Sequence, residues 1–98
     1  MVTDEERAQC VEACLACASV CDEAAGRLVD RGQRGVVDAL IACVATTRLV
    51  ADLLREEADI DPAVFELGSA ACERCIELGV EGADAVCQEA VDRLRDLL

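Results

Sequence analysis

The sequence contains no histidine, tryptophan or tyrosine, and Phe65 is its single aromatic residue. Without histidine the commonest general base is missing, and we find no glycine-rich phosphate loop and no carboxylate pair at positions expected to face an interior. We therefore expect a protein that is not an enzyme. Because aromatic side chains are nearly absent, Leu, Val, Ala and Cys must fill the core.

Basic residues are also scarce, since nine Lys and Arg stand against 21 Asp and Glu, for a formal net charge of -12. Nucleic acids and anionic membrane surfaces attract basic patches, so neither is an expected partner. No stretch approaches the ~20 uninterrupted apolar residues of a spanning helix. The opening MVTDEERAQ is acidic where a signal peptide would be basic and then apolar, so we expect a cytosolic location.

Cysteine, in contrast, is abundant, with eight in 98 residues. In a short secreted chain this density would predict a disulfide scaffold. Such scaffolds are rich in loops, whereas this chain has one proline and is dominated by Ala, Leu, Glu, Asp, Val and Arg. In a reducing compartment a dense cysteine pattern is more typical of metal binding or redox chemistry.

Local signals predict four helices in one domain, residues 1–98. Thr3 followed by Glu6 is a capping-box pattern that starts a first helix running to about Val29. The turn RGQRG follows, and a second helix is expected over Val36 to about Glu57. The segment ADIDPAV ends it, with Asp61 as N-cap and Pro62 as the first residue of a third helix. Gly79 and Gly82 bracket the next turn, and a fourth helix covers about 83–98.

Each later helix carries one stripe of residues expected to face inward. The stripes comprise Val36, Leu40, Cys43, Thr47, Val50 and Leu54 on the second helix; Phe65, Gly68, Cys72, Cys75 and Gly79 on the third; and Ala83, Cys87, Ala90, Leu94 and Leu98 or Val91 on the fourth. Because short connections make sequential helices antiparallel neighbours, we predict an all-α, antiparallel up-down-up-down four-helix bundle with a cysteine-lined interior.

The segment CVEACLACASVC places four thiols on one face of the first helix. At about 100° per residue, Cys10, Cys14, Cys17 and Cys21 fall within a sector of roughly 60° and span ~16 Å along the axis. Such a row is too long for one mononuclear tetrahedral site, but it suits several ions held in sequence. With no histidine and the carboxylates mostly on outer faces, the donors are almost purely thiolate, which favours Cu(I), zinc or iron–sulfur clusters.

The CxxxCxxCxxxC row on the first helix resembles that of the bacterial cysteine-rich four-helix-bundle copper storage proteins. ACERC (71–75) and VCQEA (86–90) are similar to the further cysteine repeats of that family. The resemblance implies interior thiols that bind several Cu(I) ions, as a cytosolic store, buffer or detoxifying sink. The second helix has only one cysteine where the family usually shows several. At two thiolates per ion, the chain would hold about four Cu(I). The implied metal ligands are Cys10, Cys14, Cys17, Cys21, Cys43, Cys72, Cys75 and Cys87.

Alternative interpretations remain open from the sequence. The same thiols could hold an iron–sulfur cluster for electron transfer. The chain could also be a structural bundle, or a homo-oligomer formed through apolar residues of the second and fourth helices, with incidental thiols. Cys43 and Cys87, each alone on its helix, could be core filler, and CERC could be a redox pair. We expect Thr46 and Thr47 to bond the preceding turn, and we expect a solvated face at Glu12, Glu73, Glu77 and Glu89.

Overall fold

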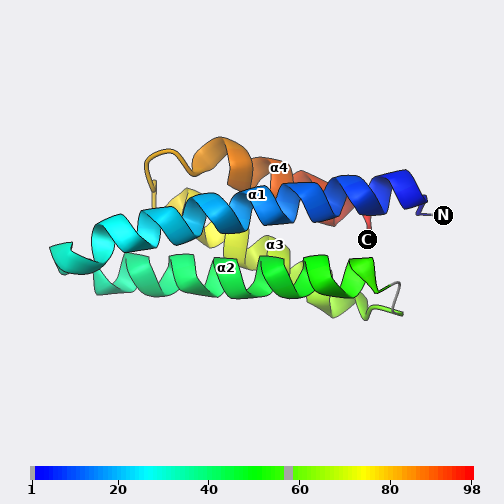
Figure 1. Ribbon diagram of the computed structural model, residues 1–98, viewed down its shortest axis with the longest axis horizontal. Coiled ribbons are helices and arrows are strands. Elements are labelled where there is room, and N and C mark those ends of the chain that lie inside the picture. The colour runs from blue at the N-terminus through cyan, green and yellow to red at the C-terminus, as the bar shows by residue number, and fades with distance from the viewer. Residues whose placement is uncertain (1, 57–58) are drawn as a thin grey trace.

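A computed structural model of the protein describes residues 2–56 and 59–98. Its four α-helices are α1 (Asp4–Leu28), α2 (Arg34–Arg55), α3 (Pro62–Glu77) and α4 (Asp84–Asp96), and a short 3₁₀ helix, η1 (Val29–Arg31), extends α1. Each helix packs against the next, and α1 also packs against α4, which closes the ring. Both termini lie at the same end of this elongated bundle (Figure 1). The predicted antiparallel up-down-up-down four-helix bundle is confirmed.

The helix starts follow the capping signals closely. Thr3 caps α1, its hydroxyl accepting a bond from the Glu6 amide while the Glu6 carboxylate accepts one from the Thr3 amide. At α3, the Asp61 carboxylate accepts a bond from the Ala63 amide at 2.9 Å, and Pro62 occupies the first turn, where its missing N–H costs nothing.

The second helix begins two residues earlier than predicted, at Arg34 rather than Val36. Gly32, with φ of 71°, makes the turn alone, so Gly35 is free to join the helix. The inner stripe also differs from the prediction at its first position, because Val37 is buried whereas Val36 is only partly buried. The predicted end near Glu57 lies outside the described residues.

One further stripe position, Gly79, was wrong, and the structure decides between Leu98 and Val91 on α4. Gly79 is exposed, because α3 ends at Glu77 and Gly79 turns the chain with φ of 65°. On α4, Val91 is buried and Leu98 is exposed, so the first of these two alternatives is the inward one. Phe65 and Gly68 on α3, and Ala90 and Leu94 on α4, face inward as predicted.

The core is built from small side chains and divides into two regions along the bundle. One surrounds Cys17, Cys21, Cys43, Cys72, Cys75 and Cys87. The other contains Cys10 and Cys14 among larger apolar side chains, including Val50, Leu54, Phe65 and Leu94. Gly68 belongs to this second region, because a Cβ there would stand 3.3 Å from Leu94 and 3.5 Å from Val50. No helix in the described part of the chain is long and apolar enough to cross a membrane.

Candidate metal centre

All eight cysteines lie inside the bundle as free thiols, each with no exposed surface. Four come from α1, one from α2, two from α3 and one from α4. Among the other buried side chains of the described residues, only Thr47 and Ser69 are polar, and none is charged. The interior therefore offers sulfur as its main donor atom.

Cys17 lies at the centre of the thiols. Its Sγ is 3.5 Å from that of Cys87, 3.6 Å from Cys43, 3.8 Å from Cys72 and 4.0 Å from Cys21. One residue of α1 thus contacts thiols from all three other helices. Cys43 and Cys87 each place their sulfur against that of Cys17. Isolated core filler would pack against apolar side chains instead.

The other sulfurs close a network around Cys17. Cys43 is 3.6 Å from Cys72, and Cys21 is 3.9 Å from Cys43 and 3.8 Å from Cys87. The sulfurs of Cys17, Cys21, Cys43 and Cys87 all lie within 4.8 Å of one another, close enough for one metal ion to contact several. Together with Cys75, whose thiol donates to the Ala39 carbonyl at 3.6 Å, these residues form what we call the central cluster (Cys17, Cys21, Cys43, Cys72, Cys75, Cys87).

Cys10 and Cys14 form a second group, the terminal pair, with their sulfurs 4.0 Å apart. Apolar side chains surround the pair, because α2, α3 and α4 place Val50, Phe65 and Leu94 in this region instead of thiols. The α1 row that the sequence predicts as continuous is therefore divided in two by its partners.

Thr47 occupies an inner position on α2, one turn from Cys43. Its hydroxyl is fully buried and donates to the Cys43 carbonyl at 2.7 Å. Thr46 makes the equivalent bond to the Ala42 carbonyl at 2.7 Å. Both threonines therefore bond the preceding turn, as expected, and satisfy their own polar groups without a ligand.

The carboxylates named from the sequence lie on the outside. Glu12, Glu77 and Glu89 are exposed, and Glu73 is partly buried in an ion pair with Arg95. The solvated-face interpretation is confirmed for the first three. CERC lies in the last two turns of α3, away from the helix N-terminus where a reactive redox pair usually stands, and both of its thiols are buried and free.

Hydrogen bonds distribute the protons of the central cluster unevenly. The pKa of Cys17 is raised, first by its bond with Cys21, and that of Cys43 is raised, first by its bond with Cys17. The pKa values of Cys21, Cys72 and Cys87 are lowered, in each case first by the bond with Cys17. The single S–H proton of Cys17 can be donated to one neighbour at a time, and it then favours the thiolate, the metal-binding form, at that neighbour.

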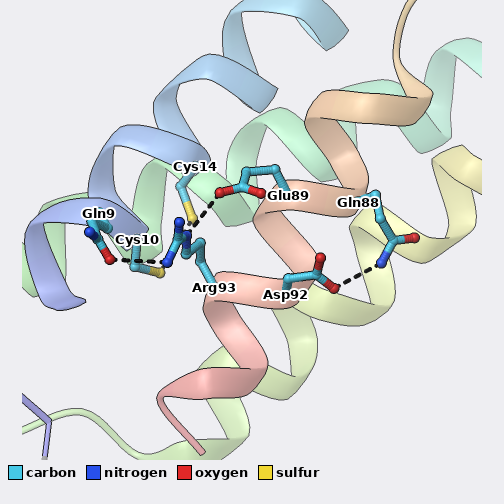
Figure 2. Close-up of polar contacts among 7 residues, drawn as sticks. All are labelled: Gln9, Cys10, Cys14, Gln88, Glu89, Asp92 and Arg93. Carbon is cyan, nitrogen blue, oxygen red and sulfur yellow. Dashed lines mark hydrogen bonds and ion pairs between the residues drawn. The ribbon is translucent and has the colours of Figure 1, made fainter.

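Arg93 is a neighbour of the terminal pair that the sequence did not indicate. It extends from α4 and donates from its Nε to Glu89 at 2.8 Å and from its Nη1 to Gln9 of α1 at 3.0 Å, beside Cys10 and Cys14 (Figure 2). The available signal was its position next to Leu94, at the edge of the inner stripe. Nothing in the sequence says which neighbouring helix that edge faces.

A helical bundle whose interior is lined by contacting thiols, with no buried charge among the described residues, is a metal-binding protein for soft ions. Comparison with known proteins agrees with this class. The family model of the copper storage proteins matches residues 3–97, nearly the whole chain, and the protein belongs to that family. No curated protein and no solved structure matches the chain.

Proposed function

We propose that this protein stores or buffers copper in the cytosol by binding several Cu(I) ions through all eight thiols, without catalysing a reaction. Membership of the copper storage family supports the metal. The observation that carries the proposal is the sulfur network around Cys17, with separations of 3.5 to 4.0 Å. With metal–sulfur bonds of about 2.3 Å, one ion can contact two sulfurs up to ~4.6 Å apart.

Bridging is the natural outcome of this arrangement. Cys17 and Cys43 each contact several sulfurs, so each could serve more than one ion. Soft monovalent copper accepts such low coordination by thiolates. An iron–sulfur cluster, in contrast, needs room for several iron and sulfide atoms between its cysteines. Sulfurs already in mutual contact leave little of that room, so the geometry favours copper.

A single tetrahedral zinc ion is the second candidate. It is supported by the quartet Cys17, Cys21, Cys43 and Cys87, whose sulfurs lie within 4.8 Å of one another. This role would leave the terminal pair, Cys72 and Cys75 without a function. Binding of one Zn(II) that Cu(I) fails to displace would favour it.

An anaerobic titration of the reduced protein with Cu(I), against a competing chromophoric chelator, tests the proposal. We expect about three to six ions per chain, centred on about four from two thiolates per ion. The Cys14→Ala, Cys17→Ala double variant should bind fewer ions, whereas Ser19→Ala, on the exposed face of the same helix, should bind as many as the unchanged protein. Failure to bind Cu(I), or an unchanged number of ions in the double variant, would contradict the proposal.

A further inference from the structure

The terminal pair differs from the central cluster in having a guanidinium beside it. The bond to Gln9 joins Arg93 of α4 to α1, and the bond to Glu89 on its own helix fixes the guanidinium near Cys10 (Figure 2). The pKa of Cys10 is lowered first by its bond with Cys14 and then by the charge of Arg93. Among the described basic residues, only Arg93 has a charge that ranks among the main causes of a pKa shift in a buried thiol, which is that of Cys10.

The charge of the bound ion decides how much this guanidinium matters. When a monovalent soft ion binds between two thiols, both protons leave, and the two thiolates and the ion together carry one negative charge. A divalent ion bound by the same two thiolates leaves no net charge. An anionic complex among Val50, Phe65 and Leu94 is costly unless a positive charge lies nearby, whereas a neutral complex is not. Arginine stays positively charged at every relevant pH, and the Glu89 carboxylate 2.8 Å away offsets part of that charge.

We propose that Arg93 is a specificity-determining residue of the terminal pair, which favours a monovalent soft ion such as Cu(I) over a divalent one at Cys10 and Cys14. The proposal rests on the function proposed above, and it adds a residue that binds no metal itself. Glu89 and Gln9 act as positioning residues, because their bonds hold the guanidinium in place near the pair.

Arg93→Gln removes the charge and keeps a side chain that can bond Gln9 or Glu89. Arg93→Lys keeps the charge. Arg95→Gln is the matched control, because Arg95 lies on the same helix but is exposed and pairs with Glu73. For each variant, binding of Cu(I) is measured by chelator competition and binding of Hg(II) by competition with a dithiol. The ion at the terminal pair is identified as the one lost in the Cys10→Ala, Cys14→Ala background.

We expect Arg93→Gln to weaken Cu(I) binding at the pair about tenfold and to leave Hg(II) binding there unchanged. Arg93→Lys should restore most of the Cu(I) affinity, and Arg95→Gln should match the unchanged protein. In the Cys10→Ala, Cys14→Ala background, Arg93→Gln should have no effect on Cu(I).

Equal weakening of Cu(I) and Hg(II) would mean that Arg93 only holds α1 and α4 together, which would overturn the inference. An effect on neither ion, or one that persists without Cys10 and Cys14, would also overturn it. The function proposed above would survive all three results, because none of them bears on whether the unchanged protein takes up Cu(I) or on whether the Cys14→Ala, Cys17→Ala variant binds fewer ions.

Discussion

The central cluster and the terminal pair begin from the same row of thiols on α1 and differ in what the other helices place opposite. Around Cys17, the facing residues are Cys43, Cys72 and Cys87. Around Cys10 and Cys14, they are Val50, Phe65 and Leu94. One region can share sulfurs among several ions, while the other offers two sulfurs and no further thiol contact. The capacity of a thiol row is therefore set by the three helices that lack the row.

Acidification should have the largest effect, because it acts on both regions together. Cys14, Cys17 and Cys43 have raised pKa values, so they are protonated at neutral pH and release their protons when an ion binds. Affinity must then fall as the pH falls, by about tenfold per displaced proton per pH unit. Chelator competition at about pH 7.5 and pH 6.5 measures this slope, and a flat profile would show that the ions bind without displacing protons.

Cys17→Ala should have the next largest effect, because it removes the thiol that contacts four others. We expect the variant to lose about two of about four Cu(I) ions, whereas Cys10→Ala should lose about one. The titration described above counts both losses. Equal losses would mean that the two regions do not differ in function, whatever their geometry.

Val50→Cys should have the smallest effect. It tests whether a thiol added to the apolar region lets that region bind a further ion. The substitution places a third thiol in the region of Cys10 and Cys14 at a packing cost of about 1 kcal/mol. We expect about one more Cu(I) ion per chain. Leu49→Cys is the control, because its neighbouring position on α2 is exposed and should add no tightly bound ion. A gain in the control but not in Val50→Cys would contradict the comparison.

Much of the fold could be predicted because its signals are local. The capping box at Thr3 and the Asp61–Pro62 start depend only on residues within one helical turn, and both form as predicted. The 3.6-residue period also placed Leu40, Cys43 and Leu94 inside. The error at Val36 arose where Gly32 and Gly35 stood near one turn and the sequence did not say that only Gly32 would adopt positive φ. The error at Gly79 arose because α3 ends at Glu77, before the stripe reaches that residue.

The arrangement of the site could not be predicted in the same way. Cys17 contacts Cys43 and Cys87, whereas Cys14 contacts neither so closely. This difference depends on how far each helix is shifted along the bundle axis. Periodicity gives the face of a residue and leaves this shift undetermined. The position of Arg93 against Gln9 depends on the same shift, 84 residues apart in the chain.

The complete burial of the eight sulfurs has a consequence for the timing of copper exchange. A chelator, a small thiol or a peroxide cannot touch a sulfur that has no exposed surface until neighbouring helices part. Loading and release must therefore wait for local opening of the bundle, whose frequency depends on helix packing. The residence time of a bound ion then depends on how often α1 separates locally from its neighbours as much as on the strength of the metal–sulfur bond.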